Sequence, residues 1–218
     1  MSHADEIDHL VDQLETGDQQ PLADLFSRCR ERLWKMVYYR MDHRLQGRVS
    51  PSDVLQDAYV DALERAPHYL ERRASMSFFV WLRLIVKQRL VTVHRRHLGA
   101  QKRDARQEVA LDYGAGSSAA SFSLASQLAA SLTSPSQVLA RAEMLSHIED
   151  ALERIEPIDC EILSLRHLEE LGNDEAAEIL GLKKAAASNR YVRALRRLRE
   201  ALANIPGYED HDAEESTQ

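Results

Sequence analysis

Residues 172–199, GNDEAAEILGLKKAAASNRYVRALRRLR, constrain the fold more than any other part of the chain. They predict a short helix, a tight turn at Gly181 and a second helix. Residues 183–199 hold seven Lys or Arg and no acid, although the whole protein carries a formal net charge of −7. A helix, a turn and a basic helix have the shape and charge of a helix-turn-helix that reads the major groove of DNA. The segment therefore predicts DNA binding.

The composition favours helices throughout. Glycine and proline are scarce, with 8 and 6 among 218 residues, and both residue types interrupt helices. The fold class that we expect is all-α: two small helical domains joined by a flexible linker, the C-terminal one a four-helix domain with the helix-turn-helix. No apolar run reaches the roughly 18 residues that would suggest a membrane span, so we expect no membrane insertion.

Acidic residues near the start of the chain stand where a signal peptide needs positive charge, which favours a cytoplasmic protein. Cys29 and Cys160 are isolated from each other in the sequence. We interpret both as buried small apolar residues in a reducing compartment.

The chain divides into zones of different character. Helical patterning fills residues 1–104, with breaks expected near residues 17–18, 47–52 and Pro67. Residues 105–139 are rich in Ser and Ala and predict a linker, in which a helix around residues 124–132 is left open. Residues 140–204 resume helical patterning, and residues 205–218 form an acidic tail that we expect to be disordered.

The last predicted helix carries the candidate DNA-reading residues. Ala187, Tyr191, Ala194, Leu195, Leu198 and Leu202 fall on its inward face. Asn and Arg side chains near the start of such a helix suit base edges, and cations further along suit phosphates. A solvated basic face on a helical bundle is the alternative for the same charges.

Two further helices carry unusual patterns. In residues 77–97, SFFVWLRLIVKQRLVTVHRRH, basic residues alternate with an apolar and aromatic stripe. Such a helix suits a phosphate backbone beside unstacked bases, although a simple amphipathic core helix has the same pattern. In residues 51–66, Asp53, Asp57 and Asp61 recur every four residues. Between two basic blocks, this acidic stripe indicates a docking surface for a basic protein.

These blocks, in this order, resemble a bacterial RNA polymerase sigma factor of the sigma-70 family, extracytoplasmic-function (ECF) group. Residues 1–104 resemble region 2 and residues 140–204 resemble region 4. The family patterns are D-x-x-Q-E-x-F, F-x-x-W-L-x-x-I followed by R-R, E-I-A-E-x-L-G and R-x-x-R-A-x-x-x-L. The matching residues here begin at Asp53, Phe78, Glu175 and Arg190. Gln88 departs from the family, which often has Asn there.

The resemblance implies a set of contacts for each region. For binding to the coiled-coil of the largest subunit of core RNA polymerase it implies Asp53, Gln56, Asp57 and Val60. For the −10 element of promoter DNA it implies Arg83, Lys87, Gln88, His94, Arg95 and Arg96. For the −35 element it implies Lys184, Ser188, Asn189, Arg190 and Arg193. It also implies that residues 68–77 receive a flipped base and that the polymerase flap is a second protein contact. An anti-sigma factor is a further partner that the resemblance allows.

Other classes of protein fit less of the sequence. A free-standing helix-turn-helix regulator explains residues 172–199 and leaves the acidic and the aromatic-basic helices without a role. A metalloenzyme would need a ligand set, yet His94 and His97 are surrounded by cations and no third ligand lies nearby. We therefore predict no catalytic residue, cofactor or metal site. A purely structural helical adaptor remains as the last alternative.

Overall fold

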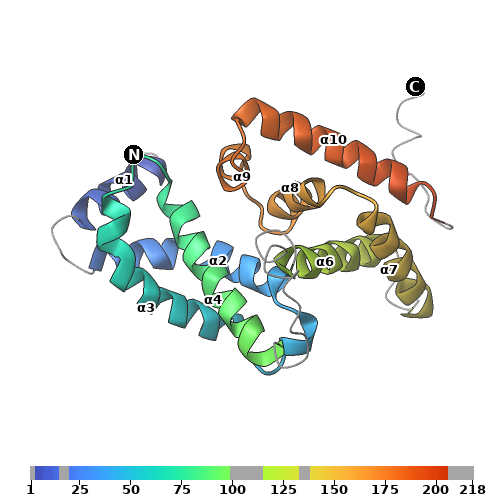
Figure 1. Cartoon of the computed structure of the whole chain (residues 1–218), viewed down its shortest axis with the longest axis horizontal. Coiled ribbons are helices and arrows are strands. Elements are labelled where there is room, and N and C mark those ends of the chain that lie inside the picture. Colours follow the sequence, from blue (N-terminus) through green and yellow to red (C-terminus); the bar gives the residue numbers. More distant parts are fainter. Residues whose placement is uncertain (1–2, 15–19, 99–114, 133–137, 206–218) are drawn as a thin grey trace. The chain divides into compact units, whose positions relative to one another are not determined.

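A computed structural model describes residues 3–14, 20–98, 115–132 and 138–205 of the chain. The chain divides into two compact units, Met1–Leu111 and Asp112–Gln218. In the described ranges the regular structure is helical, without a strand, which confirms the all-α prediction (Figure 1). No helix in those ranges combines the length and the apolar character needed to cross a membrane.

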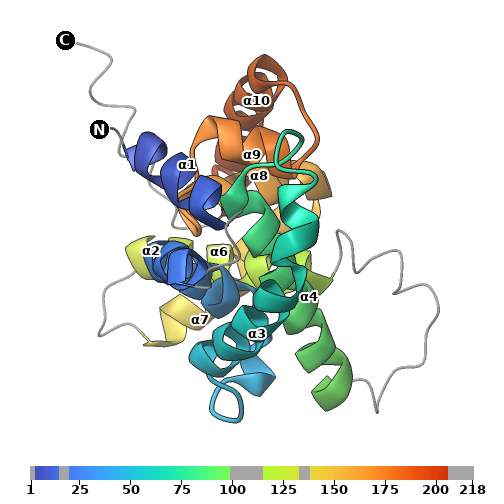
Figure 2. The same cartoon turned by 90° about the vertical axis from the view of Figure 1, so that its left-hand side faces the viewer.

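The first unit is built on helix α2 (Gln20–Arg40), which packs against α1 (His3–Leu14), α3 (Pro51–Leu70) and α4 (Phe78–Leu98). Helices α3 and α4 also pack along each other (Figures 1 and 2). A short 3-10 helix, η1 (His43–Leu45), follows α2. Fully buried side chains of this unit include Leu22, Leu25, Leu33, Met36, Leu45, Leu55 and Leu82. This apolar centre fixes the faces that α3 and α4 turn outward.

The breaks predicted in this unit are partly correct. Helix α3 begins at Pro51 behind a capping box, in which the Ser50 hydroxyl accepts from the Asp53 amide and the Asp53 carboxylate accepts from the Ser50 amide. The break predicted at Pro67 is wrong, because α3 continues through it to Leu70. A proline near the end of a helix removes one backbone hydrogen bond, which the packing of the helix compensates. Residues 17–18 lie outside the described residues.

The second unit contains α6 (Ala115–Leu132), α7 (Val138–Glu153), α8 (Pro157–His167), α9 (Asn173–Ile179) and α10 (Lys184–Leu202). Helix α10 packs against α7, α8 and α9, and α6 packs against α7 and α8. Fully buried side chains of this unit include Ile148, Ile162, Leu163, Leu165 and Leu168. The acidic tail after residue 205 lies outside the described residues.

Helix α6 occupies much of the segment whose composition predicts a linker. It begins at Ala115, nine residues before the helix that the sequence left open, and it buries Ala120, Leu124, Ala125 and Ala129. These positions fall on one helical face, and their small side chains allow close approach to α7 and α8. The second unit therefore holds α6 in addition to the four expected helices. The sequence indicates α6 only weakly, because its many alanine and serine residues give a weak apolar pattern.

The helix-turn-helix forms as predicted. The Glu175 carboxylate accepts from the backbone amide of Gly172 at 3.0 Å and caps the start of α9. Gly181 has a φ of +64°, a left-handed conformation that glycine adopts without steric cost. The turn ends at Lys183, and α10 begins one residue later. The chain reversal between the two helices is thus set by one acid and one glycine.

Candidate nucleic-acid interfaces

Helix α10 turns a polar face to solvent. Ser188, Asn189 and Arg193 are all exposed on it. The opposite face buries Ala187, Ala194, Leu198 and Leu202. The face predicted to read DNA is therefore exposed to solvent within the second unit.

Two apolar residues of α10 also reach solvent. Leu195, which the sequence pattern placed inward, is 36% exposed, and Val192 is 63% exposed. The prediction of an inward Leu195 is wrong because the buried stripe follows Ala187, Ala194 and Leu198 and leaves position 195 at its edge. Val192 follows Ser188 by one turn, so the exposed face of α10 mixes a branched apolar group with its polar residues.

The start of α10 is tied to α9. Lys184 Nζ lies 2.6 Å from Asp174 Oδ2, and the Asn173 side-chain amide donates to the Lys184 carbonyl oxygen at 3.1 Å. The Lys184 and Asp174 side chains are 72% and 65% exposed. An ion pair this exposed contributes about 1 kcal/mol or less. Lys184 can therefore exchange Asp174 for a phosphate at small cost.

Arg190 and Arg197 bind a buried acid inside the second unit. Arg190 Nη1 donates to Asp159 Oδ1 at 2.7 Å, and Arg197 Nη1 donates to Asp159 Oδ2 at 2.5 Å. The Asp159 side chain is fully buried, whereas those of Arg190 and Arg197 are 21% and 35% exposed. Asp159 lies on α8, so these bonds fasten α10 to α8. Arg190, a predicted contact of the −35 element, therefore lies in an internal cluster.

Glu156 completes this cluster at the start of α8. Its carboxylate oxygens lie 2.9 Å from Arg197 and 3.4 Å from Arg190. The hydrogen bond from Arg197, and then that from Arg190, lowers the pKa of Glu156. The bond to Glu156 in turn raises the pKa of Arg197, with a smaller contribution from Asp159. Glu156 and Arg197 thus stabilise each other's charged forms.

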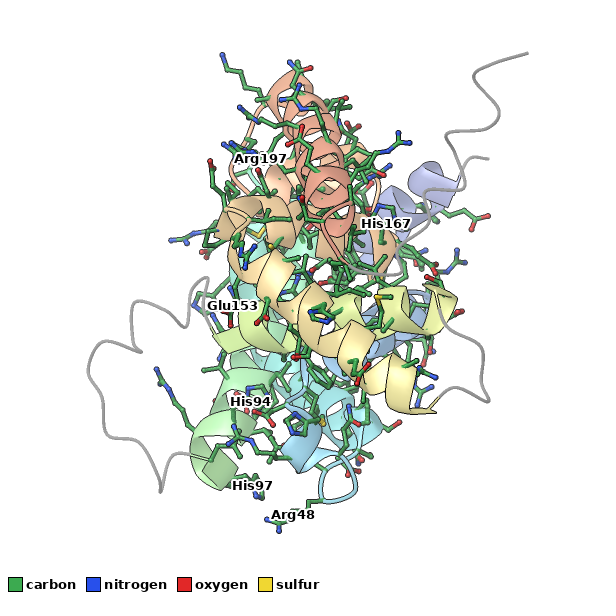
Figure 3. All side chains as sticks on the ribbon, turned by 90° about the vertical axis from the view of Figure 1, so that its right-hand side faces the viewer. Arg48, His94, His97, Glu153, His167 and Arg197 are labelled. Atoms are coloured by element: carbon green, nitrogen blue, oxygen red, sulfur yellow. The ribbon has the colours of Figure 1, made fainter. Side chains whose placement is uncertain are left out.

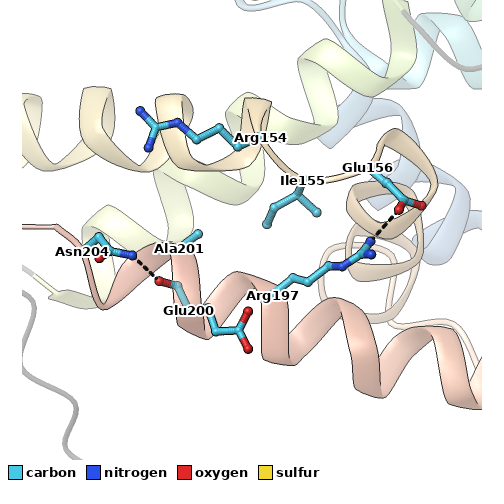
Figure 4. Close-up of a pocket in the computed structure, with 7 residues that line it drawn as sticks. All are labelled: Arg154, Ile155, Glu156, Arg197, Glu200, Ala201 and Asn204. Atoms are coloured by element: carbon cyan, nitrogen blue, oxygen red, sulfur yellow. Dashed lines mark hydrogen bonds and ion pairs between the residues drawn. The ribbon is translucent and has the colours of Figure 1, made fainter.

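A hollow of about 450 Å³ lies beside the cluster (Figure 4). It is lined by Arg154, Ile155, Glu156, Arg197, Glu200, Ala201 and Asn204. Two arginines and two glutamates balance in charge, and Arg197 is already bound to Glu156. The hollow therefore offers no excess charge to attract an ionic ligand.

The acidic stripe of α3 is exposed over most of its length. Asp53 and Gln56 are exposed, the Asp57 side chain is 58% exposed, and Val60 is 51% exposed. All four predicted polymerase contacts thus lie on the open side of α3. Asp53 is partly engaged, because its carboxylate also caps the helix.

Asp61, the last aspartate of the stripe, is bound within the first unit. Arg89 on α4 donates two hydrogen bonds to its carboxylate, at 3.1 and 2.5 Å. The Asp61 side chain is only 19% exposed. The third nitrogen of Arg89, Nη1, lies 3.8 Å from Asp57 Oδ2. Arg89 therefore joins α4 to α3. Of the three aspartates of the stripe, Asp57 is the one that neither caps the helix nor accepts a hydrogen bond from Arg89.

Helix α4 presents only some of its predicted DNA contacts. Gln88, Arg95 and Arg96 are exposed, and Lys87 is half-buried. Arg83 is 2% exposed, so its side chain lies inside the first unit. Its position beside the fully buried Leu82 explains this burial, since both face the core. Arg83 therefore does not belong to the exposed surface.

His94 is used inside the first unit. Its Nε2 accepts a hydrogen bond from the Asp42 backbone amide at 3.2 Å and so holds the end of α4 to the turn before η1. Desolvation lowers the pKa of His94, a nearby Arg44 lowers it further, and Asp42 raises it. The hydrogen bond from Arg44 holds the pKa of Asp42 at about 2. Figure 3 labels His94 on α4, one turn before His97.

The burial of His94, which lowers its pKa, predicts a pH dependence of stability. Because the folded state lowers the pKa of His94 below its usual 6.5, the unfolded chain binds more protons as the pH falls. The free energy of unfolding should have its highest value above pH 6.5, where His94 is neutral in both states, and should decrease as the pH drops through that value. Thermal unfolding between about pH 5 and 8 measures this dependence. His167, whose pKa is also lowered by desolvation, adds to it in the second unit.

The variant His94→Gln separates the two histidines. Its amide oxygen can accept from Asp42 but does not titrate in this range. The dependence of the free energy of unfolding on pH should then become weaker in the first unit, while the contribution of His167 in the second unit remains. An unchanged slope would remove His94 from the explanation.

An aromatic cluster joins the two ends of the turn between α3 and α4. Tyr69 at the end of α3 lies 5.5 Å from Phe78 and 4.7 Å from Trp81, measured between ring centroids. Tyr69 and Phe78 are buried, whereas residues 71–75 are exposed. The ends of this turn are therefore fixed, and its tip faces solvent.

No group of three or more His, Cys, Asp or Glu residues is placed to hold a metal ion in the part of the chain that the structure describes. His94 has the Asp42 amide as its partner, so its use as a ligand would break a structural bond. The arrangement that does stand out combines a basic helix-turn-helix in one unit with an exposed acidic helix and a basic helix in the other. This combination is typical of a protein that binds DNA and also contacts another protein.

Comparison with known families identifies the class. The model of the ECF sigma factor family matches residues 4–204, and the chain belongs to this family. It is therefore a sigma factor, which binds core RNA polymerase and directs promoter recognition and transcription initiation. The family is not one of enzymes.

A similar solved structure is that of CnrH in complex with the cytosolic domain of CnrY. CnrH is 20% identical to this chain, with a TM-score of 0.49, over 90% of this chain and 97% of that one. No curated protein sequence matches the chain.

Proposed function

We propose that the two units divide the work of promoter recognition. The first unit would act as region 2, with residues 1–104 docking on polymerase and opening the −10 element. The second would act as region 4, with residues 140–204 reading the −35 element. Two weak contacts joined by one chain reach high combined affinity, because the second contact forms at high effective concentration.

The polymerase contact is assigned to the exposed face of α3. Asp57 is its central acid, with Gln56 and Val60 beside it and Asp53 at the start. The observation that supports this assignment is their common exposure on one helix. A basic coiled-coil of the largest subunit would complement the charge.

The −10 contact is assigned to Gln88, Arg95 and Arg96, with Lys87 at its margin. These residues are exposed or half-buried on α4. Arg83 is excluded by its burial, and His94 supports the helix through Asp42. The turn after α3, with its tip in solvent and its ends held by aromatic rings, would receive the flipped base.

The −35 contact is assigned to Lys184, Ser188, Asn189 and Arg193. Ser188 and Asn189 lie in the first turns of α10, where a recognition helix reaches base edges. Arg193 lies one turn further and suits a phosphate. Arg190 would act indirectly, by holding α10 to α8 through Asp159.

The variant Arg193→Ala should weaken promoter binding. If Arg193 neutralises one phosphate, the plot of log Kd against log salt concentration should lose about 0.9 of its slope, because one fewer counterion is released. Binding of the holoenzyme to a promoter fragment, measured across a salt series, tests this. Arg154→Ala removes an exposed charge of the same unit outside α10 and should leave the slope unchanged. An unaltered slope in Arg193→Ala would contradict the phosphate contact.

The proposed division of labour has a direct test. The protein is combined with core polymerase and genomic DNA, and the transcript start sites are mapped. Promoters that share two short elements upstream of the start sites are expected. Loss of the −35 preference, and not of the −10 preference, is expected when Asn189 is replaced by Ala. A change in the −10 preference instead would overturn the assignment of the two units.

A further inference from the structure

Gln88 does not stand alone on the surface of α4. Arg65 on α3 donates from Nη1 to Gln88 Oε1 at 2.6 Å, across 23 residues of sequence. Both side chains are exposed at the edge between the two helices. The side-chain amide of Gln88 therefore has a neighbour that fixes which of its two ends faces outward.

The place where Arg65 meets Gln88 is rigid. Arg89, the next residue on α4, makes its two hydrogen bonds to Asp61, one turn before Arg65 on α3. Beneath them, Ala58 and Ala62 are fully buried and let the two helices approach closely. The Thr92 hydroxyl donates to the Gln88 carbonyl oxygen at 3.0 Å, one turn further along α4. The pair thus stands on two packed helices and not on a loop.

The chemistry of arginine decides the orientation of the amide. A guanidinium only donates hydrogen bonds, so it must face the amide oxygen and cannot face the amide nitrogen. Both N–H bonds of Gln88 are left pointing away from Arg65. A freely rotating glutamine offers one donor and one acceptor, which is the pattern that pairs with adenine. With Oε1 turned toward Arg65, the amide nitrogen of Gln88 is the end of the side chain that can face a base, while one lone pair of Oε1 stays available.

We propose that Arg65 is a positioning residue that turns the amide nitrogen of Gln88 toward the −10 element. Its matching base is one whose major-groove edge presents only acceptors, guanine through O6 and N7 or thymine through O4, in preference to adenine and cytosine, whose edges each present an amino donor. The proposal rests on the assignment of α4 to the −10 element. It adds a specificity-determining residue on α3 that the sequence pattern of α4 does not contain.

The test uses the full-length protein with core polymerase and a promoter library in which the −10 positions are randomised. Transcripts are sequenced, and the base preference at each position is counted. Gln88→Ala first identifies the position that Gln88 reads. At that position the unchanged protein should favour guanine or thymine, and Gln88→Ala should lose this preference by about tenfold, the value of about 1.4 kcal/mol of base discrimination.

Variants of Arg65 then test the orientation. A glutamate only accepts, so Arg65→Glu should turn the amide around and present its oxygen, which shifts the preference toward adenine or cytosine by about tenfold. Arg65→Ala frees the amide and should relax the preference, while Arg65→Lys, another donor, should keep it. The control Arg48→Ala removes an exposed cation elsewhere and should leave the preference intact. The melting temperature of each variant shows that it is folded.

The outcomes distinguish the positioning role of Arg65 from the assignment of α4 to the −10 element, on which it rests. If Gln88→Ala changes no base preference, α4 does not read a base through Gln88, and both the assignment and the inference fail. If Gln88→Ala changes the preference but Arg65→Glu and Arg65→Ala leave it as in the unchanged protein, the assignment stands and the positioning role of Arg65 is overturned. A uniform loss of transcription, with unchanged preference, reduces Arg65 to a phosphate contact and likewise overturns it.

Discussion

Replacement of Asp57 by Arg should abolish binding to core polymerase while the protein stays folded. Asp57 is 58% exposed on α3, and its only described ion pair is the 3.8 Å approach of Arg89. Reversal of its charge puts a cation against a basic partner, which should weaken binding by about 30-fold or more. Titration of core polymerase with fluorescently labelled protein measures the Kd, and the melting temperature reports the fold.

The matched control is Glu31→Arg, which makes the same change of charge on α2 of the same unit. Glu31 is 85% exposed, and its ion pair with Lys35 is long, at 3.8 Å. This variant should bind polymerase normally. Equal affinity of Asp57→Arg and the unchanged protein would refute the docking role of α3.

Replacement of Asp159 by Ala should destabilise the second unit more than any surface substitution. Two arginines would lose their shared buried acceptor, and breaking a buried pair commonly costs about 3–5 kcal/mol. Because Arg190 and Arg197 are partly exposed, water can replace part of the lost bonds, and we expect a loss of about 2–3 kcal/mol. Chemical denaturation followed by circular dichroism measures the free energy of unfolding.

The variant Asp174→Ala provides the comparison for Asp159→Ala. It removes an aspartate of the same unit that pairs with Lys184 at the surface, and it should cost about 1 kcal/mol or less. Promoter binding should fall in Asp159→Ala, since α10 loses its fastening to α8. Similar losses of stability in the two variants would show that burial of Asp159 contributes nothing.

The fold was largely predictable because its signals are local. Ser50 before Pro51, Glu175 after Gly172, and Gly181 each mark a helix end through bonds within a few residues. For helix α6, the sequence left open only a helix around residues 124–132, because its buried face consists mostly of alanine, whose burial depends on the neighbouring helices and not on its own hydrophobicity.

The candidate sites were predictable in outline and not in detail. Exposure of Asp57 and Asn189 follows from helical periodicity, which places them opposite the buried stripe. The internal roles of Arg190 and His94 depend on partners far away in sequence, Asp159 and Asp42. One signal was present: Asp159 is an acid among the apolar residues of α8, and a buried acid requires a cation. The spacing of residues in the sequence does not show which arginines pair with this acid.

The bonds between Asp159 and the two arginines of α10 also bear on protein engineering. Promoter specificity is often pictured as a property of the recognition helix, which invites exchange of that helix between relatives. Here α10 contributes two of the four charges of an internal cluster, and the two acids, Glu156 and Asp159, lie at the start of α8 and on it. A chimera that receives α10 without an acid at position 159 would gain two cations that lack their buried acceptor. The transferable module is therefore α8 through α10, residues 157–202, and not the reading helix by itself.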